Sequence, residues 1–439
     1  MKVYIFHHFK NIFSRLITFS AIFTLIISLL APLTVSVPAN AAPSEDTLRG
    51  IWLSYVDFEP AGLYNKSESD FILAADKVFA TLEHYGYNNV FFHVRPFDDA
   101  IYPNSSFKWC TYLAPKPLKY DALAYLIEAA HKHNIEFHAW INPYRITIDK
   151  IYNPAKKSTT THIVNGVKEI IENYNVDGIH FDDYFYPSIQ KGKQFYKVSV
   201  ETRKKNVNEM INKVFTTIKD YDANIAFGVS PSGNTEYAKS IGCDLETWIN
   251  EEDYIDYIIP QLYWSDNYRL GGKKVKYFTK TLKEWTKLNN NKLPIYIGLA
   301  LYKAGTVRPE DPGWRNNSNN MGIQAKLADK YLCDGYVMFS YQYLFTNEGK
   351  AENGSFIKYI SGLSLKTKQI KLKKNKRYNI SKKVSVNKKY KSAFKFSSSD
   401  KTVATVSASG IIHAKKKGRA RITVQALGGS KVHCMVWVI

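Results

Sequence analysis

The stretch that decides the fold is Val176-Asp177-Gly178-Ile179-His180-Phe181-Asp182-Asp183-Tyr184-Phe185-Tyr186-Pro187. Successive side chains of a strand point to opposite faces, so Ile179 and Phe181 share one face and His180 and Asp182 share the other. In a barrel of parallel strands, the apolar face packs on helices and the other face points inward. A strand that ends in a carboxylate at its C-terminal end is typical of a (β/α)8 barrel enzyme.

Seven further apolar runs lie on either side of this strand, about 30 to 50 residues apart. With it they predict eight strands: 50–56, 89–94, 136–141, 178–181, 225–229, 257–262, 294–299 and 335–339. Helical periodicity lies between them, over 69–85, 121–133, 201–220, 275–288 and 319–332. This α/β alternation predicts a (β/α)8 TIM barrel. An open doubly wound sheet is the alternative, weakened because no glycine-rich phosphate loop follows the first strand.

The pattern changes near Ser361-Gly362, where helical periodicity gives way to short alternating runs separated by turns such as Ser409-Gly410 and Gly428-Gly429. Such runs predict a small all-β immunoglobulin-like sandwich. Its strands are expected at 369–372, 378–380, 393–397, 404–406, 411–414, 420–426 and 432–438.

The N-terminus predicts export. Lys2, Lys10 and Arg15 flank the apolar run 16–30, and Ala39-Asn40-Ala41 is a small-x-small cleavage site. We therefore predict a secretory signal peptide over 1–41, a catalytic barrel over 42–362 and a basic sandwich over 363–439. The mature protein is expected outside the cell or on its wall and not in the membrane; a retained membrane anchor is the alternative.

Charge is concentrated at the C-terminus. Residues 364–439 hold 20 lysines and arginines and one acid, Asp400, whereas 42–363 hold 37 basic and 38 acidic residues. A polycation outside the cell predicts an anionic partner, such as a teichoic acid, an acidic glycan or an anionic lipid surface. Export argues against nucleic acid. The alternative is a lysine-rich surface that only keeps the domain soluble.

The predicted strand ends place many polar side chains on inward positions: His93 and Arg95 on the second strand, His138, Trp140 and Asn142 on the third, and Gln261 and Tyr263 on the sixth. A purely structural barrel fills these layers with Val, Ile and Leu. Buried polar groups are costly unless they are satisfied, so this concentration predicts an active site.

Glycosidic cleavage needs an acid and a second group that supplies or activates the nucleophile. Asp182 and Asp183 are the predicted catalytic pair, because repulsion between neighbouring carboxylates raises one pKa and favours a general acid. The predicted substrate-binding residues are Arg95, Asp98, Asp99, His138, Trp140, Asn142, Arg145, His180, Gln261, Tyr263 and Trp264. For Asp98-Asp99, a turn-capping pair is the alternative.

No cofactor and no metal are expected. His93, His138 and His180 nevertheless fall on inward positions of neighbouring strands, and three histidines could bind a metal. Histidines hydrogen-bonded in the core are the preferred interpretation, since no H-x-H or H-x-x-x-H spacing occurs among them. Four dispersed cysteines, Cys110, Cys243, Cys333 and Cys434, predict buried free thiols.

Several blocks of the barrel resemble the bacterial glycosyl-hydrolase-like 10 family, in order from about Arg49 to Phe345. They are 49–53 (RGIWL), 93–103 (HVRPFDDAIYP), 138–145 (HAWINPYR), 176–187 (VDGIHFDDYFYP), 255–257 (IDY) and 260–264 (PQLYW). The resemblance implies a (β/α)8 barrel acting on glycans, with members that cleave peptidoglycan strands lacking stem peptides. The loop after 230–233 departs from the family by lacking an expected Trp and Arg.

The strand-four block is also similar to the family-18 chitinase pattern, but His180 stands at its intermediate Asp and Tyr184 at its catalytic Glu. No Glu ends the seventh strand, so a retaining pair on strands four and seven is not expected. The tail resembles the group 2 bacterial immunoglobulin-like domain through 399–407, 410–414 and 417–424. That resemblance implies an adhesive or spacer module.

Three functions therefore remain open from the sequence. The first is hydrolysis of cell-wall glycan, with peptide-free peptidoglycan strands as the expected substrate. The second is a non-catalytic glycan-binding surface protein. The third is a metal-dependent polysaccharide deacetylase.

Overall fold

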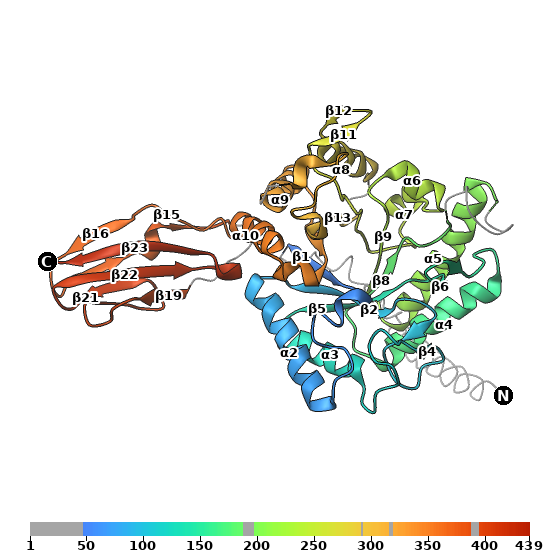
Figure 1. Ribbon diagram of the computed structural model, residues 1–439, viewed down its shortest axis with the longest axis horizontal. Helices are drawn as coiled ribbons and strands as arrows, with labels where there is room; N and C mark the ends of the chain where they lie inside the picture. The colour runs from blue at the N-terminus through green and yellow to red at the C-terminus, as the bar shows by residue number, and fades with distance from the viewer. Residues whose placement is uncertain (1–46, 188–196, 291–292, 316–318, 388–394) are drawn as a thin grey trace, which may run out of the picture. The chain divides into compact units, whose positions relative to one another are not determined.

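The computed structural model describes residues 47–187, 197–290, 293–315, 319–387 and 395–439. These residues form an α/β barrel followed by a β-rich region (Figure 1). The predicted signal peptide, 1–41, lies outside the described residues. Within the part that is described, no helix combines the length and apolar character needed to cross a bilayer.

Eight parallel strands make the barrel, and strands that are consecutive in sequence are neighbours in the ring. They are β1 (Leu48–Leu53), β2 (Asn89–Arg95), β5 (Glu136–Ile141), β8 (Gly178–Asp182), β9 (Ala226–Ser230), β10 (Tyr257–Ile258), β13 (Tyr296–Leu299) and β14 (Gly335–Phe339). β1 pairs with both β2 and β14. Bridges from Ile258 to Ile295 and from Gln261 to Gly298 connect the remaining edges. The predicted barrel is confirmed.

Helices connect successive strands on the outside of the ring. They are α2 (Glu68–Tyr85), α3 (Ala122–Lys132), α4 (Lys157–Asn173), α5 (Val200–Tyr221), α6 (Thr235–Ser240), α7 (Leu245–Asn250), α8 (Tyr277–Leu288), α9 (Asn320–Lys330) and α10 (Asn347–Ser361). Side-chain caps fix several starts, as Ser67 accepts from Asp70 N and Ser199 from Thr202 N. Gly86 ends α2 in the left-handed region, with φ of 82°.

Short strand pairs decorate the connections: β3 (Asp99–Ala100) with β4 (Lys108–Trp109), β6 (Arg145–Thr147) with β7 (Lys150–Ile151), and β11 (Tyr268–Leu270) with β12 (Lys273–Val275). The main core lies between the ring and its helices. It contains aliphatic and aromatic residues from both, among them the stacked rings of Phe92 and Phe137, 5.5 Å apart.

Aromatic rings fill the barrel interior instead of the aliphatic layers of a structural barrel. Trp52, Phe91, Trp140 and Tyr257 are all buried in one cluster there. Glycines on neighbouring strands make room for these rings. A Cβ on Gly228 would lie 2.2 Å from the Tyr257 ring, which excludes any larger residue at that position.

The β-rich region is a sandwich of two packed sheets. One sheet has the order β16 (Gln369–Leu372), β23 (Lys431–Val438), β22 (Gly418–Gln425) and β19 (Lys395–Ser398). The other has the order β17 (Arg377–Asn379), β21 (Ile411–Ala414) and β20 (Ala404–Val406), and β15 (Ser364–Leu365) pairs with β18 (Val384–Ser385). A single cluster including Ile412, Ile422 and Val436 joins the two sheets. Predicted strand residues 393–394 lie outside the described part.

All four cysteines are buried and unpaired, as predicted.

Candidate active site

Asp182 and Asp183 lie where β8 leaves the barrel. Asp182 is 7% exposed and Asp183 is half-buried. Asp182 Oδ1 accepts hydrogen bonds from Asp183 N at 2.8 Å and from Gln261 Nε2 at 3.1 Å. Asp183 Oδ2 accepts from Ser232 N at 2.7 Å. The two carboxyl groups lie within hydrogen-bonding reach of each other, so the strand and the following loop hold them as a pair.

The pKa values of the two carboxyl groups are raised to different extents. Burial raises the pKa of Asp182 to about 6, against the opposing effects of its hydrogen bond from Asp183 N and the charge of Arg145. Burial also raises the pKa of Asp183, and the neighbouring charge of Asp182 raises it further, well above its ordinary value. Burial thus disfavours ionisation of both carboxyl groups, and the charge of Asp182 disfavours it further at Asp183, which is the asymmetry that acid–base chemistry uses.

Gln261 holds the Asp182 carboxyl group in place by a hydrogen bond. Its Nε2 donates to Asp182 Oδ1 and also to Ser230 O at 2.9 Å, which ties β8, β9 and the end of β10 together. Gln261 therefore points inward, as the alternation of side chains predicted. Because the side-chain amide is shared with a main-chain carbonyl, the rotamer of Gln261 is fixed before any ligand arrives.

Arg145 supplies the positive charge at the mouth. Its guanidinium lies 3.9 Å from the ring centroid of Tyr184 and 5.0 Å from that of Phe97. Tyr184 is 46% exposed, and the negative charge of Asp182 is the first cause that raises the pKa of its hydroxyl. Arg145 and Tyr184 thus lie beside the carboxyl pair, with Tyr184 open to solvent.

Two groups of rings flank the carboxyl pair. Tyr55, Phe97 and Tyr112 pack together with centroid distances of 4.6 to 5.8 Å. Tyr263, Tyr302 and Phe339 pack at 5.6 to 6.2 Å, and the charges of Asp182 and Asp183 act on the Tyr263 hydroxyl. Half-exposed rings of this kind offer faces on which a sugar can stack.

Only Tyr263 of these rings was predicted from the sequence. Tyr55, Tyr112, Tyr184 and Tyr302 follow their strands by two or more residues, where the alternation of a strand no longer fixes direction. The signal that points to them is the accumulation of aromatic residues after strand ends.

Polar atoms without partners also face this region. Among the described residues, no hydrogen bond is made by the Nε1 of Trp140, by either ring nitrogen of His93 or by Oδ1 of Asn142. The His93 and Trp140 rings are stacked, with centroids 3.6 Å apart. Burial lowers the pKa of His93 well below its ordinary value, so the imidazole is neutral. These atoms have almost no contact with solvent, and the side chain of Asn142 acts on the pKa of His93, so they belong to the packed layer under the site.

Arg95 departs from its predicted inward direction. The pairing of β2 with β5 shifts between His93 and Arg95, so that Val94 is an extra residue in β2. A bulge of this kind reverses the alternation after it. The guanidinium instead lies 3.2 Å from the ring centroid of Phe107, and a Cβ on Gly166 of α4 would meet it at 1.8 Å. The expectation that Arg95 faces the barrel mouth is wrong.

Asp98 and Asp99 are bound by the protein itself. Asp98 accepts from Tyr152 Oη at 2.6 Å and lies 2.9 Å from His162 Nε2. Asp99 accepts from Phe97 N at 3.0 Å, two residues before it in the chain, which is the reverse of the bond in the predicted turn cap. The structure does not bring this second doublet into contact with Asp182 and Asp183.

His138 and His180 belong to a hydrogen-bonded layer below the mouth. His138 Nδ1 and His180 Nδ1 lie 3.1 and 3.3 Å from the Tyr257 hydroxyl. His180 Nε2 also lies 3.2 Å from Trp52 Nε1, which donates to it. Both rings are buried, which places them under the site and not at its surface. In the part of the chain that the structure describes, no three His, Cys, Asp or Glu side chains converge as metal ligands.

Trp264 is half-buried and packs at 4.9 Å against Tyr277, beside Gly233. It therefore borders the loop after β9.

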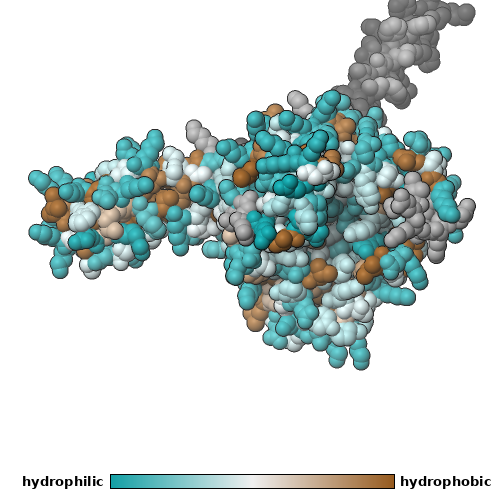
Figure 2. Space-filling model, turned by 45° about the horizontal axis from the view of Figure 1, so that its top comes forward, coloured by the Kyte–Doolittle hydropathy of each residue, from teal (hydrophilic) through white to brown (hydrophobic). Residues whose placement is uncertain are grey.

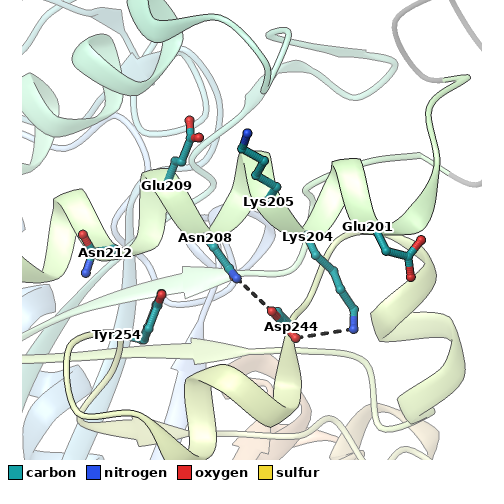
Figure 3. A pocket seen from close by; sticks show the side chains of 8 residues that line it. All are labelled: Glu201, Lys204, Lys205, Asn208, Glu209, Asn212, Asp244 and Tyr254. Atoms are coloured by element: carbon teal, nitrogen blue, oxygen red, sulfur yellow. Dashed lines mark hydrogen bonds and ion pairs between the residues drawn. The ribbon is translucent and has the colours of Figure 1, made fainter.

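A separate open groove of about 650 Å³ lies on the outer side of the barrel (Figure 3). One wall is α5, which presents Glu201, Lys204 and Asn208, and Asp244 faces it. Lys204 Nζ lies 3.4 Å from Asp244 Oδ1, and Asn208 Nδ2 donates to Asp244 Oδ2. The groove contains none of the predicted site residues.

Comparison with known proteins identifies a family for the barrel and another for the sandwich. The model of the glycosyl hydrolase-like 10 family matches residues 47–151 and 145–316. The chain belongs to this family. The bacterial Ig-like domain (group 2) model matches residues 360–436, which contain the sandwich.

Two curated relatives carry glycosyl hydrolase names. Glycosyl hydrolase YngK of Bacillus subtilis is 30% identical over 65% of this chain, and the match spans 66% of its own length, just under two thirds. Glycosyl hydrolase DigH of Escherichia coli is 27% identical over 66% of this chain and 81% of its own length. Both names describe a glycosyl hydrolase.

A solved structure shares the fold. The PgaB (BpsB) glycoside hydrolase domain from Bordetella bronchiseptica has a TM-score of 0.50 and 9% identity, covering 71% of this chain and 99% of that domain. At this identity the likeness concerns the barrel fold alone.

Proposed function

We propose that this member of the glycosyl hydrolase-like 10 family hydrolyses glycosidic bonds in cell-wall glycan, with peptide-free peptidoglycan strands as substrate. One observation carries the proposal: a pair of contacting carboxyl groups, Asp182 and Asp183, at the mouth of the barrel, in which the charge of Asp182 raises the pKa of Asp183 beyond the effect of burial. The flanking rings support a ligand with ring faces on which they can stack.

The contact between the two carboxyl groups bears on the mechanism. Carboxyl groups that flank a scissile bond from both sides are about 5 to 9.5 Å apart, which a hydrogen-bonded pair is not. A substrate with a 2-acetamido group can supply its own nucleophile, and amino sugars of peptidoglycan carry this group. The close pair therefore favours substrate-assisted cleavage.

In the proposed reaction, Asp183 gives its proton to the glycosidic oxygen as the bond from C1 to that oxygen breaks. The acetamido oxygen bonds to C1, and the Asp182 carboxylate accepts the acetamido N–H. Water then attacks C1, the bond from C1 to the acetamido oxygen breaks, and Asp183 recovers a proton from that water. Gln261 and Arg145 keep Asp182 oriented and ionised.

The proposed location is outside the cell or on its wall, based on the secretory signal predicted over residues 1–41. There the basic sandwich would contact anionic wall polymers. Neither a nucleic acid nor a membrane is a proposed partner of the mature protein.

The test is the mass of products from digestion of peptide-free glycan strands, compared with intact sacculi and unrelated polysaccharides. Products that gain one water and expose new reducing ends support the proposal. Release of acetate that chelators abolish identifies a deacetylase instead. Tight binding to the strands without new reducing ends identifies a glycan-binding protein.

A further inference from the structure

The positive charge of the sandwich is not spread evenly over its two sheets. We define the outer sheet face as the solvent-facing side chains of β16, β23, β22 and β19. Ile370, Ile422 and Val436 point into the sandwich core, so the residues alternating with them point outward. The exposed cations on this face are Lys371, Lys395, Arg419, Arg421 and Lys431.

The opposite sheet provides the contrast. On β17, β21 and β20, the positions that alternate with the core residues are Arg377, Asn379, Ile411, His413 and Thr405. Arg377 is the single lysine or arginine among these positions.

No acid neutralises the outer sheet face. Its strand positions include no Asp or Glu, and among the described sandwich residues no lysine or arginine forms an ion pair. Asp400, the one acid of residues 364–439, accepts hydrogen bonds from Thr402 N and Val403 N at the turn before β20. Figure 2 shows hydrophilic side chains over most of the visible surface of the sandwich. The field of the outer sheet face therefore acts on an external anion.

The spacing of two arginines on this face favours a polymer of phosphates over other anions. Arg419 and Arg421 project from the same side of β22 two residues apart, a spacing of about 7 Å. Arginine binds the oxygens of a phosphate through two parallel N–H groups, which a lysine cannot do. Successive phosphates of an extended glycerol-phosphate chain are separated by a similar distance.

The face also offers an apolar contact between the cations. Trp437 is half-buried on β23, opposite Arg419 in register, and the Arg419 guanidinium lies 4.4 Å from its ring centroid. Lys371 lies opposite Trp437 on its other side. A row of cation, ring and cation matches a polymer in which phosphates alternate with a CH-rich polyol.

We infer that the outer sheet face docks the protein on a polyol-phosphate polymer of the cell wall, of the teichoic acid type. This inference rests on the proposed wall location and deepens the proposed role of the sandwich. Several separate contacts, each of moderate strength, give binding that decreases as salt increases.

The experiment measures binding of the full chain to immobilised poly(glycerol phosphate) at several salt concentrations. The double variant Arg419→Gln/Arg421→Gln is expected to bind about tenfold more weakly, because two bidentate contacts are lost. The matched control, Arg377→Gln/Lys401→Gln, removes the same net charge away from the face and is expected to change binding by less than about twofold. An equal loss of binding in both double variants would overturn the inference that the outer sheet face is the docking surface.

Arg419→Lys/Arg421→Lys keeps the charge and tests the phosphate geometry. Binding about threefold weaker than that of the unsubstituted chain supports bidentate contacts, and unchanged binding overturns them. Equal or tighter binding to polygalacturonate, a carboxylate polymer, overturns the assignment to phosphate. Thermal melting of each variant confirms folding. Hydrolysis of soluble peptide-free glycan by the unsubstituted chain is measured separately, so failure of docking and failure of the glycosidase proposal are distinguished.

Discussion

Two barrel strands end in the same dipeptide, and the structure gives the two copies different surroundings. Asp98-Asp99 follows β2, and its carboxylates are engaged by Tyr152, His162 and a main-chain N–H. Asp182-Asp183 ends β8, and its carboxyl groups face each other with both pKa values raised. Among the described residues, each doublet has three polar partners in the protein, so the comparison teaches that the number of donors does not distinguish them. What distinguishes Asp182-Asp183 is burial together with the direct action of one carboxyl group on the other.

The largest expected effect separates the two doublets by activity. Asp182→Asn and Asp183→Asn should each lower kcat/KM on peptide-free glycan by about 100-fold or more, because each removes one partner of the proton transfer. Asp220→Asn, an exposed acid at the end of α5, serves as the control. Full turnover in both variants would remove these residues from the mechanism.

The next largest effect concerns how the activity supplied by Asp182-Asp183 depends on pH. Asp182 must be ionised, so activity should rise with pH through about 6. The charge of Arg145 lowers the Asp182 pKa. Arg145→Gln should therefore move the acidic limb of the kcat profile to higher pH and reduce the rate at pH 6 more than at pH 7.5. A limb that does not move would show that another group controls it.

A smaller effect is expected at the first doublet. Asp98→Asn removes the charge but keeps an oxygen for Tyr152, so kcat/KM should fall by less than about tenfold and stability by about 1 kcal/mol. Steady-state kinetics and thermal melting measure the two quantities. A loss as large as that of Asp183→Asn would place Asp98 in the chemistry after all.

The smallest effect concerns stability. A carboxyl group whose pKa is raised in the folded protein stabilises the fold below its unfolded value near 4, and this contribution is lost as pH increases. The fold should therefore weaken through Asp183 as pH increases above about 4. Asp183→Asn lacks this loss and should be on the order of 1 kcal/mol more stable than the unsubstituted chain at pH 7.5. Denaturant melts at pH 5 and 7.5 test this, and parallel curves would contradict it.

The barrel could be predicted because alternation and spacing repeat eight times. The inward positions of His93, Trp140, Asp182 and Gln261 follow from the same alternation. Prediction failed where the backbone broke it: one extra residue at Val94 turned Arg95 toward α4.

The second limit on prediction from the sequence was contacts between segments that lie far apart in the chain. The sequence could not show that Tyr257, from β10, would hold both His138 and His180 in a buried layer. Nor could it show that Ser232 N would hold Asp183.

The ring-filled interior has a consequence for how a polymer would be attacked. Trp52, Trp140 and His180 occupy the lumen up to the layer beneath Asp182 and leave no shaft into which a chain terminus could be threaded. A glycan can therefore meet Asp182 only from the open side above this layer of rings, so the loops at the mouth and not the lumen must hold it.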